Sequence, residues 1–175
     1  MSCSDVILKE KVRGSWQSLH DTNILRGVSR LSTRLPEMEI VTKAAEMLTK
    51  CKEITLASIN ENGYPRVCVL SKNKSEGLTK IWVATALSSV KTRNFMENPK
   101  ASVCFYSGGD SATLVGKVSV IQDRAVKADM WIDWYTNHFP GGIEDPEYCI
   151  LEFTAEEATL WIDQEFVTLR GEQIQ

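Results

Sequence analysis

The sequence predicts a mainly β protein, an antiparallel barrel with helices packed on its outside. About seven short segments are rich in β-branched and aromatic residues. Turn signals suited to hairpins separate several of them, such as Asn62-Gly63 and Gly108-Gly109-Asp110. No strand–helix–strand series alternates regularly along the chain, which argues against a doubly wound parallel sheet. These observations together favour hairpin-connected strands that close into a barrel.

The length and composition of the chain fit one globular domain. It has 175 residues, of which 43% are hydrophobic and 25% charged, and its formal net charge is −3. This charge lacks the basic field that binding to nucleic acid or an anionic membrane surface needs. No stretch approaches the roughly 20 apolar residues of a membrane-spanning helix. We therefore expect neither a nucleic acid nor a membrane as a partner.

The cysteines and the N-terminus point to the cytoplasm. None of the five cysteines forms a C-x-x-C pair, and none lies at metal-ligand spacing to His20 or His138. The first residues contain no long apolar core of a signal peptide. We expect reduced, mostly buried thiols in a cytoplasmic protein without a metal site.

The first half of the predicted domain is a helix followed by three strands. Pro36 suits a first helical position, and apolar residues then recur at helical spacing as far as Cys51. A loop that contains Asn73 and Gly77 separates the second strand from the third. The three strands are predicted over residues 53–60, 64–71 and 80–85.

The second half contains two further helices and the remaining strands. Ser88 or Ser89 can cap a short helix that reaches Glu97, because Asn98-Pro99 stops it. The strands are predicted over residues 101–106, 112–122, 147–153 and 158–163, the second helix over 125–135, and a loop over 137–146. Residues 1–35 are mixed and polar, and the sequence leaves open whether they form a helix or a loose arm.

Arg66 stands within an otherwise apolar strand. Strand alternation places Arg66, Cys68 and Leu70 on one face and Val67, Val69 and Ser71 on the other. An arginine in such a strand needs an anion, a carboxylate or water for its guanidinium group. A phosphate suits the planar fork of donors. A strand-end arginine that reaches solvent or a carboxylate is the alternative.

The segment from Thr85 to Lys91 joins a strand end to a helix start. A helix N-terminus presents free N–H groups and the positive end of the helix dipole, so anions bind there. Thr85 and Ser89 add hydroxyl groups, and Lys91 adds a positive charge. The alternative is a plain serine cap with a solvated lysine.

The two segments are more informative together than alone. We expect them on adjacent strands of one sheet, with an apolar surface between them that includes Val67, Val69, Leu70 and Ala84. A flat aromatic ring with a phosphate tail fits such a surface. The chain has no P-loop, no G-x-G-x-x-G after a strand and no arrangement typical of a hydrolase triad. If the protein is an enzyme, we expect a bound cofactor to supply the reactivity.

Several short motifs resemble one known family in their order and spacing. They are Gly63-Tyr-Pro-Arg66 followed by Val-Cys-Val-Leu70, Val-Ala-Thr85, Ser-Ser-Val-Lys91, Asn98-Pro99, Val115-Gly-Lys117, Trp134 followed by Phe139-Pro-Gly-Gly142, Asp145-Pro146 and Ala158-Thr-Leu-Trp161. In these the chain resembles the pyridoxamine 5′-phosphate oxidase-like FMN-binding split barrels, and among them the general-stress-protein branch. The resemblance covers residues 36–163 and implies an antiparallel six- to seven-stranded split β-barrel with peripheral helices, of the α+β class. Residues 1–35 and 164–175 are then an N-terminal arm or helix and a C-terminal tail.

The resemblance also implies a cofactor and a partner. It implies a homodimer with two FMN molecules at the subunit interface, in which Trp161 reaches the flavin of the other subunit. Arg66 and Lys91 would bind the phosphate. The full set of residues carried over as cofactor-binding is Arg66, Val67, Val69, Leu70, Ala84, Thr85, Ser89, Val90, Lys91, Ser111 and Trp161.

Two positions depart from the vitamin oxidases of this family. Those enzymes have a lysine where this chain has Ser71 and an arginine where it has Val90. They also end in an Arg-Leu-His-Arg-like substrate segment, whereas residues 164–175 hold only Arg170. We therefore do not expect oxidation of pyridoxine phosphate.

Three functional hypotheses follow. The first is an FMN-dependent oxidoreductase that acts on a small substrate, with a nicotinamide as a possible reductant and no side chain that stands out as a general base. The second is a non-catalytic protein that binds or buffers flavin in stress. The third replaces FMN with haem or a deazaflavin, although neither His20 nor His138 lies where an axial ligand is expected.

Overall fold

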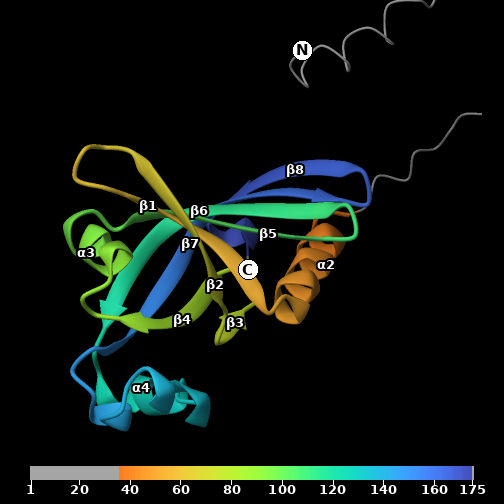
Figure 1. The fold of residues 1–175 in the computed structure, drawn as a ribbon. Coiled ribbons are helices and arrows are strands. Elements are labelled where there is room, and N and C mark those ends of the chain that lie inside the picture. Colours follow the sequence, from red (N-terminus) through yellow and green to blue (C-terminus); the bar gives the residue numbers. More distant parts are fainter. Residues whose placement is uncertain (1–35, 175) are drawn as a thin grey trace, which may run out of the picture. The chain divides into compact units, whose positions relative to one another are not determined.

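The structure, a computed structural model, describes residues 36–174, so the expected N-terminal arm lies outside the described residues. Its centre is one antiparallel sheet in the order β2-β1-β5-β6-β7-β4-β3, with β8 paired to β7. Figure 1 shows the sheet curling on itself, with α2 and α3 at its two ends. The strands are β1 (Glu53–Ile59), β2 (Pro65–Ser71), β3 (Lys74–Glu76), β4 (Lys80–Ala86), β5 (Lys100–Ser107), β6 (Asp110–Ile121), β7 (Tyr148–Ile162) and β8 (Glu165–Arg170). The predicted mainly β, antiparallel split barrel is confirmed.

The predicted hairpins form where glycine permits a positive φ. Gly63 has φ +80°, and the side-chain oxygen of Asn60 accepts the N–H groups of Asn62 and Tyr64, which closes the β1–β2 turn. Gly108 and Gly109 have φ of +61° and +106° and form the two-residue connection between β5 and β6. These turns fix the register of both hairpins.

Three predicted boundaries differ from the structure. The two closing strands are one strand, β7, which spans 15 residues because it crosses both halves of the curled sheet. The expected loop after β2 contains the short strand β3. The expected tail contains β8, whose Val167 and Leu169 face inward between exposed neighbours, and a 3-10 helix, η3 (Gly171–Ile174). The sheet has eight strands for this reason.

The strands β6 and β7 approach closely at one glycine. Their register shifts between Val115 and Gly116, which marks a β-bulge. A Cβ on Gly116 would overlap the carbonyl oxygen of Thr154 on β7. Only glycine allows the two backbones to lie this close.

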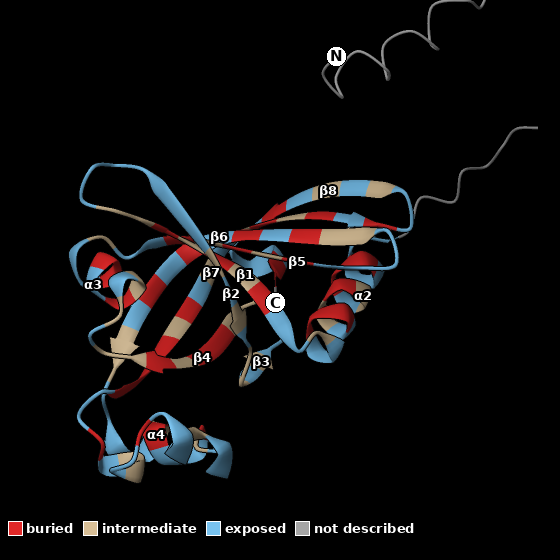
Figure 2. Cartoon of the chain, in the orientation of Figure 1, coloured by how far each residue is buried: buried red, intermediate tan, exposed pale blue. Residues whose placement is uncertain are grey.

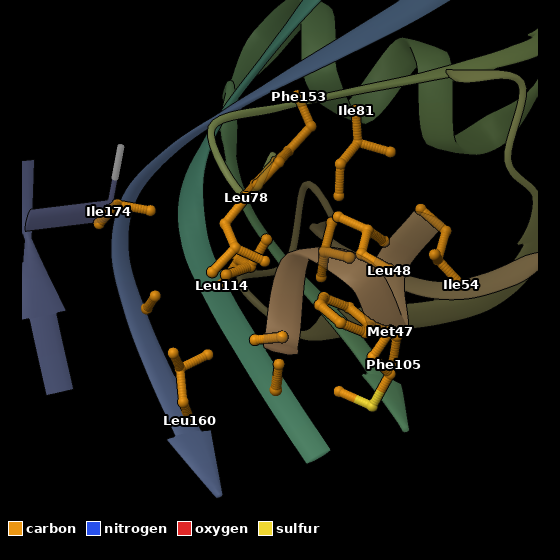
Figure 3. Close-up of a cluster of buried hydrophobic side chains, with 14 of the residues drawn as sticks. Met47, Leu48, Ile54, Leu78, Ile81, Phe105, Leu114, Phe153, Leu160 and Ile174 are labelled. Carbon is orange, nitrogen blue, oxygen red and sulfur yellow. The ribbon is translucent and has the colours of Figure 1, made fainter. Parts of the chain in front are cut away.

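One hydrophobic cluster fills the barrel. The helix α2 (Glu37–Lys50) turns Ile40, Ala44 and Leu48 inward, where they meet inward-facing residues of the sheet. Figure 2 shows the resulting alternation of buried and exposed residues along the strands, and Figure 3 shows the side chains packed around Leu48, Leu114 and Phe105. In residues 36–174, no buried side-chain nitrogen or oxygen lacks a hydrogen-bond partner.

The segment between β6 and β7, residues 122–147, forms a small lobe that we call the wing. It contains α4 (Arg124–Asp129) and two 3-10 helices, η1 (Asp133–Asn137) and η2 (Gly142–Glu144). A second cluster, made of Trp82, Met130, Phe139, Tyr148 and Ile150, joins the wing to the outside of the sheet. The helix predicted over 125–135 ends early, because the carbonyl oxygen of Met130 accepts a hydrogen bond from Asn73.

The remaining helix, α3 (Val90–Glu97), follows β4 and has Ser89 as its N-cap, as predicted. No helix within residues 36–174 is long and apolar enough to cross a membrane.

Candidate functional site

The predicted alternation of β2 is confirmed. Cys68 and Leu70 pack against the core, whereas Val67 and Val69 on the other face are 64% and 65% exposed. Arg66 is exposed and lies opposite Ser58 of β1 in the antiparallel register. The strand therefore presents two valines outward and an arginine at its start.

The start of α3 leaves donors free. Ser89 Oγ accepts the N–H of Thr92 and lies 2.8 Å from Thr92 Oγ1, which donates to the carbonyl oxygen of Ala86. The hydroxyl proton of Thr92 is thus used in the bond to Ala86, so the hydroxyl of Ser89 donates its own proton to Thr92 Oγ1. Ser89 is fully engaged as a cap. The backbone N–H groups of Val90 and Lys91, in contrast, have no acceptor among the described residues.

A buried hydrogen bond brings Arg66 and Lys91 together. Asn94 lies one turn beyond Lys91 on α3, and its Nδ2 donates to Ser58 Oγ at 2.9 Å. Both side chains are buried. Since Ser58 is the register partner of Arg66, this bond fixes α3 beside the start of β2.

The environment of the Cys68 thiol agrees with this placement of Arg66 and Lys91. Burial raises its pKa, while the positive charges of Lys91 and then Arg66 act in the opposite direction. Both cations therefore lie close enough to one sulfur atom to influence its ionisation. We call the region that contains these two positive charges and the free N–H groups at the start of α3 the cationic corner.

The two segments do not lie on adjacent strands, and this expectation was wrong. β1, β5, β6 and β7 separate β2 from β4 in the sheet. The curl of the sheet brings β2 and β4 into contact instead. Sequence reasoning missed this because the hairpin signals describe only neighbouring strands.

Asn73 links the end of β2 to β4 through hydrogen bonds. Its backbone N–H donates to Trp82, its Oδ1 accepts the N–H of Ala84 at 2.8 Å, and its Nδ2 donates to the Met130 carbonyl and the Tyr135 hydroxyl. One side chain thus joins the end of β2, the strand β4 and the wing. The sequence indicated only a loop at this position.

Thr85 is buried at the end of β4, opposite Cys149 of β7. The thiol of Cys149 donates to the Thr85 carbonyl oxygen at 3.4 Å. Burial raises the pKa of Cys149 to about 11, and the Thr92 hydrogen bond and the charge of Lys91 oppose this rise. Lys91 therefore also lies near the end of β4, as the sequence predicted.

Ser111 and Trp161 lie elsewhere. They face each other across β6 and β7, and their row continues to Tyr106 on β5 and Phe166 on β8. The row of Arg66 meets β5 at Ala101. The two rows are five residues apart on β5, which corresponds to about 17 Å at the usual rise per residue. Within one chain, Trp161 is therefore remote from the cationic corner.

The outward face of the sheet carries large apolar side chains that nothing in the described residues covers. Trp161 is 41% exposed, and the others are more exposed still. The members of this outer face are Val67, Val69, Tyr106, Val115, Trp161 and Phe166. Contiguous apolar surface of this kind marks a site of interaction.

A family profile matches most of the chain. Residues 40–162 match the family described as Pyridoxamine 5′-phosphate oxidase. The matched segment begins in α2 and ends at the last residue of β7, so it includes the cationic corner and leaves out β8. No curated protein sequence matches the chain.

Solved structures share the fold. A protein related to general stress protein 26, of the pyridoxinephosphate oxidase family, from Clostridium acetobutylicum is 28% identical with a TM-score of 0.70, covering 81% of this chain and 100% of that one. General Stress Protein 26 from Bacillus anthracis is 22% identical with a TM-score of 0.64, covering 75% and 100%. A heme binding protein from Mycobacterium smegmatis is 14% identical with a TM-score of 0.63, covering 77% and 59%.

Proposed function

Because the chain belongs to the pyridoxamine 5′-phosphate oxidase family, we propose that it binds FMN and is a flavin-dependent oxidoreductase for a small molecule. The observation that carries this proposal is the cationic corner. Arg66 and Lys91 come from segments far apart in sequence, and the buried hydrogen bond from Asn94 to Ser58, the register partner of Arg66, holds these segments side by side. A phosphate monoester is the ligand that two cations and free backbone N–H groups suit best.

The residues present fit the cofactor. Arg66 and Lys91 hold the phosphate together with the N–H groups of Val90 and Lys91. Val67 and Val69 offer the apolar surface for the ring, whereas Leu70 packs against the core and Ala84 packs against the Trp82 cluster. Ser89 acts through the cap of α3, since its hydroxyl is already engaged. When bound, the flavin would supply the chemistry of accepting and donating electrons.

The outer face supports the second part of the proposal, a homodimer with flavin at its interface. Nothing within residues 36–174 covers the exposed apolar side chains of this face. Trp161 and Ser111 are remote from the cationic corner of their own chain, so they can contact a flavin only in a second copy. A symmetric dimer brings both sets of residues to each of two sites.

Ser71 and Val90 argue against oxidation of pyridoxine phosphate, because neither offers a charge to a second phosphate. A flavin-binding protein without turnover is the alternative, and the 28% identity to a protein related to general stress protein 26 is compatible with it. The heme binding protein from Mycobacterium smegmatis shares the fold alone at 14% identity. The one histidine in residues 36–174, His138, is exposed on the wing beside Trp134.

Titration of the flavin-free protein with FMN tests the proposal. We expect saturable binding of one FMN per chain and a dimeric mass in analytical ultracentrifugation. Absence of uptake at any concentration contradicts flavin binding, and a monomer that binds FMN contradicts the interface. Reduction of the bound flavin by NADH or NADPH, followed by reoxidation, separates an enzyme from an inert binder. A haem absorption spectrum of the purified protein would show that the cofactor is haem and not FMN.

A further inference from the structure

A cavity of about 450 Å³ lies where the end of β2 meets the wing. Its volume is within the range of about 300–1,000 Å³ that small-molecule sites occupy. Ser71, the last residue of β2, forms part of its wall. Ser71 shares the outward face of β2 with Val67 and Val69, two residues beyond the second valine. The cavity therefore continues the surface that we assign to the flavin ring.

The opposite wall of the cavity is aromatic and apolar. Trp131, Ile132 and Trp134 of the wing line it. Trp134 is 61% exposed and Ile132 is 51% exposed, although both are large apolar side chains. Exposed indole and aliphatic groups on the wall of a cavity favour a flat apolar ligand.

The aromatic wall is held in place by the wing. The ring of Trp131 makes edge contacts with Tyr135 and Tyr148, with centroids 5.8 Å and 5.1 Å apart. Asn73 fixes Met130 and Tyr135 through the two protons of its amide nitrogen. A wall fixed in this way loses little conformational entropy when a ligand binds.

The polar groups around the cavity already have partners. Asn73 uses both amide protons and its oxygen within the chain. Lys74 pairs with Asp129 at 3.4 Å, and the ammonium of Lys72 donates to Ser75, which is not part of the wall. Within residues 36–174, Lys72 is the one cation of the wall that has no ion pair, so a dianionic ligand finds one positive charge for its two negative charges. The aromatic wall and this single charge suit a weakly polar molecule better than a dianion.

We infer that this cavity binds a flat, weakly polar aromatic molecule of the quinone type beside the flavin, with Trp134 as its stacking surface. The inference rests on the proposed function for the position of the flavin, but the cavity itself is formed by residues of a single chain. In this arrangement the wing recognises the second ligand. It also separates this site from one that recognises a phosphate.

Equilibrium dialysis with menadione, a two-ring quinone, tests the inference on the full chain. We expect saturable binding, and we expect Trp134→Ala to weaken it by about 2- to 10-fold, the usual value of one aromatic stacking contact. Trp134→Phe retains a ring and should stay within about twofold of the wild type. Met96→Ala is the matched control, because Met96 is 54% exposed on α3 and outside the cavity.

Pyridoxine 5′-phosphate, which is flat but dianionic, is the comparison probe. We expect it to bind more weakly than menadione. Tighter binding of the phosphate, or menadione binding that is unchanged in Trp134→Ala, overturns the inference. FMN uptake is measured in the same preparations. Uptake of FMN without menadione binding contradicts only this inference, whereas menadione binding without FMN uptake contradicts the proposed function and the pairing of the two ligands.

Discussion

The same strands form the interior of the barrel and the outer face of its sheet, but the two sides differ in whether their side chains have partners within one chain. Inside, residues such as Leu48, Leu114 and Leu160 are completely buried, and every buried polar side chain has a partner within residues 36–174. Outside, Val67 and Val69 are about two-thirds exposed. At the start of β2, Arg66 is exposed as well, and within residues 36–174 neither Arg66 nor Lys91 forms an ion pair. The alternation of each strand sends one set of residues to each side.

The difference shows which parts of the molecule one chain completes. The interior satisfies its own apolar and polar groups, so substitutions there should change the free energy of unfolding. The outer face leaves apolar surface, and the cationic corner leaves positive charge, for a cofactor and a second copy, so substitutions there should change binding and leave the fold intact. The predictions below test this division.

The largest effect is expected inside the sheet, at Gly116. Gly116→Ala forces a Cβ against the Thr154 carbonyl oxygen, and backbone cannot move aside cheaply. We expect a loss of about 3 kcal/mol or more in the free energy of unfolding, measured by denaturant titration. Val115→Ala is the control, because Val115 is 45% exposed on the outer face of the same strand. Equal effects of the two substitutions would contradict the division.

In the cationic corner, Lys91→Ala should weaken FMN binding. We expect FMN affinity to fall by about 1.5–3 kcal/mol, the value of a charge-assisted hydrogen bond, in a flavin titration. The free energy of unfolding of the flavin-free protein should change by less than about 0.5 kcal/mol. Lys50→Ala on α2 removes the same charge far from the site and should leave FMN affinity unchanged. Unchanged affinity in Lys91→Ala would show that the phosphate assignment is wrong.

Asn94 belongs to both regions, so Asn94→Ala should affect both measurements. Its buried hydrogen bond to Ser58 is lost, which costs about 1–3 kcal/mol of stability because Ser58 is left without this partner. FMN affinity should fall as well, since the bond holds α3 beside Arg66. Ser58→Ala and the double variant complete a double-mutant cycle. Purely additive effects on stability would mean that the bond does not couple the two elements.

The smallest effect is expected at Glu147. The Glu147 carboxylate accepts the N–H of Ser88 at 3.0 Å, and hydrogen bonds from the Ser88 side chain and then from this N–H lower the pKa of Glu147 below the ordinary value of 4.5. A pKa that is lower in the folded state stabilises the fold above the unfolded value, and this contribution fades as the pH falls through the folded pKa. The stability difference between wild type and Glu147→Gln should therefore shrink between about pH 6 and about pH 3. A difference that grows on acidification would reverse the assignment.

Local signals in the sequence were sufficient for most elements of the fold. The Asn62-Gly63 and Gly108-Gly109 turns, the Ser89 cap and the alternation in β2 all depend on neighbouring residues. The continuous β7 and the strand β8 could not be predicted in the same way, because their pairing is set by partners distant in sequence. The early end of α4 likewise depends on Asn73, more than 50 residues upstream.

The candidate site likewise combines residues that have a local signal in the sequence with contacts that have none. Arg66 and Lys91 could be proposed as anion-binding residues from their sequence context, and the structure places the strand and the helix that carry them side by side. The means by which it does so, the Asn94–Ser58 hydrogen bond and the closure of β2 onto β4 by Asn73, had no local signal. An asparagine in a loop or in a short helix looks the same in sequence whether it is solvated or buried.

The central claim is that Arg66 and Lys91 hold one phosphate where the start of β2 lies beside the start of α3. The most direct test compares FMN with riboflavin, which lacks the phosphate, in titrations of the wild type and the Arg66→Ala/Lys91→Ala double variant. We predict that the wild type prefers FMN by tenfold or more, which corresponds to about 1.4 kcal/mol, and that the double variant binds the two flavins equally. A double variant that keeps the full preference for FMN would contradict the account.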